Sequence, residues 1–114
     1  MPHYLISFPS SAMSHVSEED FPSVGESSHA VIREAKAAGV YVFGGGIDEH
    51  VPPVMVAGDG TVTPGTYPET SKFNGGFCVL KLPTRQRAEE WAAKIAASCR
   101  CAQELRQFGF DPES

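Results

Sequence analysis

A predicted strand that passes directly into an amphipathic helix is the feature that most constrains the fold. Residues 76–82 (Gly-Phe-Cys-Val-Leu-Lys-Leu) are rich in strand-forming side chains, and Pro83 stops the run. Thr84 is a good N-cap for a helix to about Ser98, in which Ala88, Trp91, Ala92 and Ile95 form one apolar stripe. This pair of elements predicts a domain that mixes helices with strands.

The rest of the chain supplies a second strand–helix–strand unit and an insertion. Ser17 with Asp20 predicts a capping box for a short turn, and Pro22 is expected to prevent a long helix from running straight through. Gly39 is placed to end the first long helix. The expected elements are a strand at 3–8, a helix at 27–38, a strand at 40–43, a hairpin at 54–63 that turns at Asp59-Gly60, and a last strand at 103–110.

This order predicts an α+β, ferredoxin-like βαββαβ fold with an inserted hairpin, as one domain over residues 1–114. Two helices would cover one face of a four-stranded antiparallel sheet. The other face would expose apolar residues such as some of Tyr4, Ile6, Phe77 and Val79. Because an exposed apolar face needs a partner, we expect a homodimer formed face to face.

Composition excludes several classes of protein. Nine Lys and Arg against fourteen Asp and Glu give a net charge of −5, which argues against a nucleic-acid partner. No apolar stretch approaches the ~20 residues of a membrane helix, and the N-terminus does not resemble a signal peptide, so a cytoplasmic protein is expected. Three cysteines do not suggest a disulfide framework, and we expect them to pack rather than to bind metal or act in redox chemistry.

Several segments together resemble the YCII-related proteins, in particular the branch named for an Asp-Gly-Pro-Phe tetrapeptide. They are residues 37–46 (Ala-Ala-Gly-Val-Tyr-Val-Phe-Gly-Gly-Gly), 65–70 (Gly-Thr-Tyr-Pro-Glu-Thr), 75–77 (Gly-Gly-Phe) and 90–92 (Glu-Trp-Ala). The resemblance runs from about Tyr4 to Phe110 and implies a dimeric α+β barrel. At the defining tetrapeptide the chain has Pro64-Gly65-Thr66-Tyr67, so Pro64 replaces the carboxylate.

The resemblance also implies candidate chemistry. It makes His29, ten residues before Gly39, the acid–base residue of a cofactor-independent lyase, isomerase or dehalogenase that acts on a small cyclic or aromatic acid. Asp48 or Glu69 would assist the imidazole. No metal and no cofactor are expected. The alternative is a non-catalytic dimer that binds a small ligand or serves as an accessory protein, which the loss of the carboxylate at Pro64 somewhat favours.

Each candidate also has a plain structural interpretation. His29 lies roughly 130° from the apolar stripe of its helix, on the side of Arg33 and Lys36, which is typical of an exposed surface residue. His50 follows Asp48 and Glu49 in a loop that can be either functional or merely solvated.

The ligand-binding candidates are aromatic. Tyr67 would line the cleft if its loop folds over it, and Tyr4 and Phe77 would contribute from the strands. His29 and His50 with Asp48 or Glu69 could in principle form a metal site, but no local ligand spacing supports one.

Overall fold

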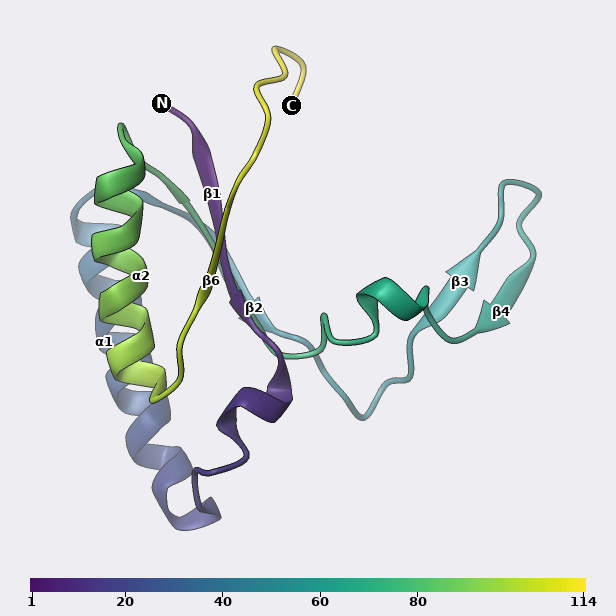
Figure 1. Ribbon diagram of the computed structural model, residues 1–114, viewed down its shortest axis with the longest axis horizontal. Coiled ribbons are helices and arrows are strands. Elements are labelled where there is room, and N and C mark those ends of the chain that lie inside the picture. The colour runs from purple at the N-terminus through teal and green to yellow at the C-terminus, as the bar shows by residue number, and fades with distance from the viewer.

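The computed structural model describes all residues from 1 to 114 (Figure 1). Its elements are β1 (His3–Phe8), α1 (Phe21–Ala37), β2 (Tyr41–Gly46), β3 (Val54–Val56), β4 (Val62–Pro64), β5 (Gly76–Lys81), α2 (Arg85–Cys99) and β6 (Glu104–Gln107). Short 3₁₀ turns occur at Ser10–Met13, Glu18–Asp20 and Pro68–Thr70. Neither helix has the length and apolar character needed to cross a membrane.

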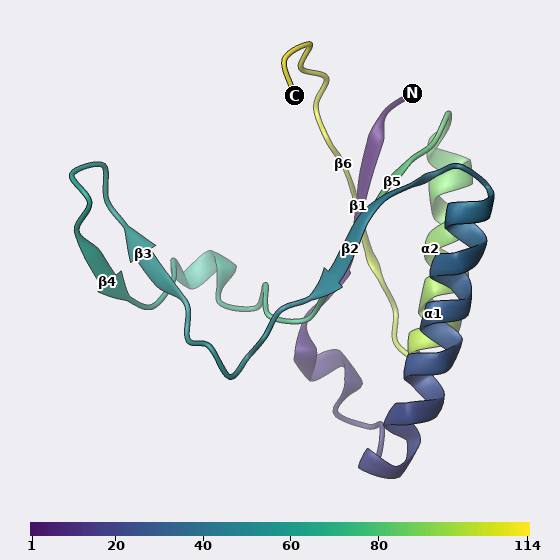
Figure 2. The ribbon, with the colours of Figure 1, turned by 180° about the vertical axis from the view of Figure 1, so that it is seen from behind.

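Four strands form one sheet in the order β2-β5-β1-β6, and all neighbouring strands are antiparallel. The two helices lie side by side on one face of this sheet, and the opposite face carries no helix (Figures 1 and 2). Strands β3 and β4 pair only with each other, as a separate hairpin. The predicted α+β, ferredoxin-like fold with an inserted hairpin is confirmed.

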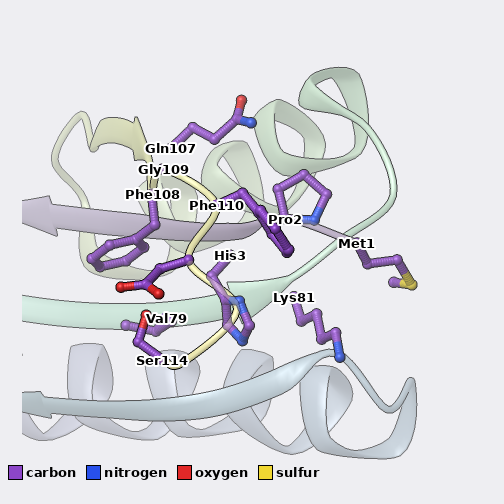
Figure 3. Close-up of a pocket in the computed structure, with 11 residues that line it drawn as sticks. Met1, Pro2, His3, Val79, Lys81, Gln107, Phe108, Gly109, Phe110 and Ser114 are labelled. Carbon is purple, nitrogen blue, oxygen red and sulfur yellow. The ribbon is translucent and has the colours of Figure 1, made fainter.

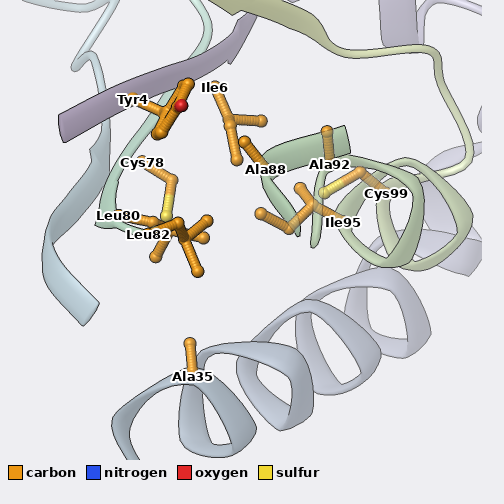
Figure 4. Close-up of a cluster of buried hydrophobic side chains, with 10 residues drawn as sticks. All are labelled: Tyr4, Ile6, Ala35, Cys78, Leu80, Leu82, Ala88, Ala92, Ile95 and Cys99. Carbon is orange, nitrogen blue, oxygen red and sulfur yellow. The ribbon is translucent and has the colours of Figure 1, made fainter. Parts of the chain in front are cut away.

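The core lies between the sheet and α2. In the register of β1 with β5, Tyr4 stands opposite Leu80 and Ile6 opposite Cys78, and all four side chains are buried (Figure 4). The helices add Ala35 from α1 and Ala88, Ala92, Ile95 and Cys99 from α2. The expectation that Tyr4 or Ile6 is exposed on the open face is wrong, because strand alternation puts both on the helix side. Phe77 and Val79 alternate with Cys78 and Leu80, so they lie on the open face.

Three predicted boundaries were wrong. The last strand, β6, ends at Gln107 rather than Phe110, and the other two differences have identifiable reasons. Helix α1 begins at Phe21 rather than Ser27, because Pro22 sits in the first turn, where its missing N–H is not needed. Strand β2 does not stop at Phe43 but continues through three glycines, which pair in turn with Cys78, Phe77 and Gly76. The end of α1 at Gly39 is confirmed, since this glycine takes a φ of 74°.

The inserted segment, residues 47–75, forms an arm that leaves the sheet after β2 and returns before β5. Its hairpin turns at the predicted Asp59-Gly60, where the Ala57 N–H donates to the Thr61 carbonyl at 2.8 Å. At the base of the arm, the ring of Phe73 lies 6.0 Å from the ring of Phe77. Both views show the hairpin standing away from the sheet and the helices (Figures 1 and 2).

Candidate active site

A cavity of about 410 Å³ lies between the first half of α1, the end of α2 and the strands β2 and β5. We call it the α1–sheet pocket. Its apolar lining side chains are Ile6, Phe8, Ile32 and Ile95, and its other lining residues are Ser28, His29, Tyr41, Gly44, Gly45, Gly46, Gly76, Phe77, Cys78, Ser98, Cys99 and Gln103. A volume of this size suits a small organic ligand.

The pocket exists because its floor has almost no side chains. Where Gly44 faces the helices, a Cβ atom would come within 3.1 Å of the Tyr41 hydroxyl oxygen and 3.3 Å of the Phe77 carbonyl oxygen. At Gly76, a Cβ atom would lie 2.6 Å from the ring of Phe8. Both distances are shorter than an ordinary contact of about 3.5–4.0 Å. The glycines therefore leave room for the side chains of Tyr41 and Phe8, which border the cavity.

His29 lines this pocket from α1, on an exposed part of the helix. Its imidazole makes no hydrogen bond or ion pair within the chain, and neither does the Tyr41 hydroxyl. The other hydroxyl and amide side chains of the lining are already engaged: Ser28, Ser98 and Gln103 donate to the carbonyls of Gly25, Ile95 and Cys101. His29 and Tyr41 are thus the lining residues whose polar atoms are free to meet a ligand.

The predicted carboxylate partners do not lie beside His29. The Asp48 carboxylate accepts the backbone N–H of His50 at 3.0 Å and lies 3.3 Å from the His50 imidazole, whose side chain is fully exposed. Glu69 and Tyr67 are exposed on the arm, where Glu69 makes no ion pair. No group of three or more His, Cys, Asp or Glu side chains gathers in a form that could hold a metal ion.

The two strand aromatics proposed as ligand contacts differ in position. Tyr4 is 1% exposed and belongs to the core. Phe77 borders the α1–sheet pocket with its backbone, whose carbonyl oxygen lies near Gly44, while its ring packs on Phe73 on the open face. Sequence reasoning missed Tyr41 and Gln103 as lining residues. The sequence did carry a signal for Tyr41. Three glycines follow it closely in the same strand, and residues without side chains leave space next to a large ring.

The thiols of Cys78 and Cys99 line the pocket, but they are not suited to react with a ligand. Burial, with a smaller contribution from the neighbouring Cys99, raises the pKa of the Cys78 thiol to about 11. Burial also raises the pKa of Cys99, although a hydrogen bond from Ser98 opposes the shift. Since the thiolate is the reactive form of cysteine, these residues are poor nucleophiles at neutral pH.

A second, wider hollow of about 670 Å³ lies on the open side of the sheet, between the two ends of the chain (Figure 3). His3, Val79 and Lys81 border it from the strands, and Phe108 and Phe110 border it from the C-terminal segment. It contains none of the residues predicted to act on a ligand. The α1–sheet pocket is therefore the better candidate site, although it is the smaller of the two.

The comparisons with known proteins agree with the family suggested by the sequence motifs. The sequence model of the YCII-related domain matches residues 13–100, which include both helices, β2, β5 and the whole arm. No curated protein matches the sequence. Because the matched segment covers most of the chain, the protein belongs to the YCII-related family.

Proposed function

We propose that this YCII-related protein is a cofactor-independent acid–base enzyme that acts on a small cyclic or aromatic acid in the α1–sheet pocket. The observation that carries the proposal is the free imidazole of His29 on the lining of a cavity with a glycine floor. The apolar walls formed by Ile6, Phe8 and Ile32 suit a flat hydrocarbon ring. The unpaired Arg33, one helical turn from His29, suits the carboxylate of such an acid.

The chemistry needs a group that gains and loses a proton near neutral pH, and imidazole is the side chain suited to this. In the proposed step, the His29 imidazole accepts a proton as a C–H bond of the ligand breaks, and the bonding pair moves into an adjacent carbonyl. The Tyr41 hydroxyl donates a hydrogen bond to that carbonyl oxygen. The electron pair of the resulting enolate then takes the proton back from the imidazolium at a different carbon, so the carbonyl is restored and the step balances as an isomerisation.

A second candidate function is ligand binding without chemistry. A catalytic imidazole is usually oriented by a third group, and no carboxylate of the chain lies beside His29. Pro64, at the position where the Asp-Gly-Pro-Phe branch carries its carboxylate, lies in β4 and brings no charge to the pocket. These two observations are the support for ligand binding without chemistry as the second candidate.

For the assembly, we propose a homodimer in which the open faces of two sheets stack. Phe43 is 66% exposed on this face, beside the partly buried Leu5, Val79 and Phe77, so each chain presents an apolar strip to a second copy. Burial of such a strip is a common reason for association. Sedimentation tests the assembly: a dimer has twice the 12.2 kDa of one chain.

Proton exchange with solvent tests the enzyme proposal even while the natural substrate is unidentified. Small cyclic keto acids are incubated with the protein in D₂O, and loss of the proton next to the carbonyl is followed by NMR. The wild-type protein and the control variant His50→Ala should accelerate this exchange, whereas His29→Ala should not. Exchange that survives in His29→Ala contradicts the proposed role. Binding of the same acids without exchange in the wild type supports the second candidate instead.

A further inference from the structure

The hairpin of the arm has one face that is entirely apolar. In its register, Val54 stands opposite Pro64 and Val56 opposite Val62. Opposed residues and residues two apart along a strand share a face, so these four side chains form one patch, which we call the hairpin patch. Met55 and Thr63 form the other face. The three valines are 54%, 66% and 59% exposed, in chain order, so nothing in their own chain covers the patch.

The hairpin also lacks support from the rest of the molecule. The hydrogen bonds of the Ala57, Gly60 and Gly65 amides all end on carbonyls inside the hairpin. A two-stranded hairpin alone is marginally stable in water, and three exposed valines add no stability to it. The arrangement is reasonable only if the hairpin patch is packed against another surface.

The surface area of the chain indicates how much must be covered. One chain exposes 7766 Å², whereas a compact monomer of this mass is expected to expose about 6,100 Å². The excess of roughly 1,700 Å² is about twice what one partner contributes to a standard interface, and two chains that buried it would fall in the range of obligate homodimers. The radius of gyration, 15.6 Å against about 13 Å expected, shows the same excess of extension.

We propose that the arm is a dimerisation element whose hairpin patch packs on a second copy of this chain. A second copy is the occupant because the excess area matches an obligate homodimer and exceeds what one standard interface would cover. In a twofold assembly each copy provides one arm and receives one, so both patches are covered at once. Tyr67 and Glu69, which the arm carries away from the pocket of their own chain, then lie at or near the subunit interface.

Two neighbouring substitutions test this surface. Val62→Asp places a charge in the hairpin patch, and the control Thr63→Asp places the same charge on the opposite face of the same strand. Sedimentation over a concentration series should show the dimer Kd raised at least about tenfold by Val62→Asp and by less than about threefold by Thr63→Asp. A wild-type chain that remains monomeric, or equal effects of the two variants, overturns the proposal.

A second measurement leaves the hairpin unaltered, in case Val62→Asp unfolds it. Isotope-labelled and unlabelled wild-type chains are mixed, and NOEs that cross between chains are selected. Crossing NOEs to the methyl groups of Val54, Val56 and Val62 are expected. A dimer without such NOEs overturns the proposal, even if Val62→Asp weakens association. Neither outcome bears on the role of His29, which the exchange assay tests separately.

Discussion

Gly44→Ala should destabilise the protein, because this glycine makes room for Tyr41 on the floor of the pocket. The added methyl group would meet the Tyr41 hydroxyl oxygen at 3.1 Å and the backbone carbonyl oxygen of Phe77 at 3.3 Å. The tyrosine can move, but the carbonyl is fixed in the β2–β5 ladder. Overpacking of this kind costs about 1–3 kcal/mol, and removal of a flexible glycine from a strand returns about 0.5–1 kcal/mol.

Gly46 provides a matched control, two residues along the same strand and on the same face. Its added methyl group would meet only the Gly75 carbonyl oxygen, at an ordinary 3.9 Å. Gly46→Ala should therefore be neutral or slightly stabilising, and the two variants should differ by about 2 kcal/mol in the free energy of unfolding. In urea titrations at one fixed protein concentration, this difference moves the midpoint by about 1 M.

Combining Gly44→Ala with Tyr41→Phe in one protein isolates the cause of the lost stability. Tyr41→Phe removes the oxygen that lies closest to the new methyl group, so it should recover part of the stability that Gly44→Ala loses. A Gly44→Ala variant as stable as Gly46→Ala would refute the packing of Tyr41 over the glycine floor. Loss of stability that Tyr41→Phe does not relieve would assign the whole cost to the Phe77 carbonyl.

Two further predictions concern buried polar groups. The raised pKa of Cys78 means that the unfolded chain releases this proton near pH 9 while the folded chain holds it to about pH 11, so stability falls with pH across that window. Unfolding of the wild type and Cys78→Ala between pH 8 and 11 should show a steeper decline in the wild type, and parallel curves would contradict the assignment. The Ser7 hydroxyl is buried without a hydrogen-bond partner, so Ser7→Ala should leave the free energy of unfolding unchanged or raise it by about 1 kcal/mol. If calorimetry shows that Ser7→Ala lowers the free energy of unfolding by more than about 1 kcal/mol, the hydroxyl has a hydrogen-bond partner.

The layers of the fold could be predicted from the sequence because local signals agreed with the final packing. The stop at Pro83, the cap at Thr84 and the apolar stripe of α2 all lie where the structure has them. Errors arose where context overrode a local rule. Pro22 reads as a helix breaker but is tolerated in the first turn, and Gly44 to Gly46 read as the end of a strand but are held in the ladder by β5.

The candidate site was harder to predict, because its cavity is formed by residues that lie far apart in the sequence. His29 was identified from the family resemblance, whereas its helical position beside Arg33 and Lys36 suggested only solvent. The structure places His29 on the lining of the α1–sheet pocket, at an exposed position of α1. The Asp48 contact with the His50 backbone is a local Asx turn, but local patterns could not show that Glu69 is carried outward on the arm. The placement of Glu69 follows from the course of residues 47–75, which local patterns do not specify.

An NMR titration of the labelled protein with benzoate and cyclohexanecarboxylate tests the central claim most directly. If the α1–sheet pocket binds small cyclic acids, the amide signals of Gly44, Gly45, Gly46 and Cys99 should shift together and saturate, and His29→Ala should change the affinity. Shifts centred on His3 and Phe108 would place binding in the hollow on the open face instead. Such a result, or no saturable shift with either acid, would contradict the account.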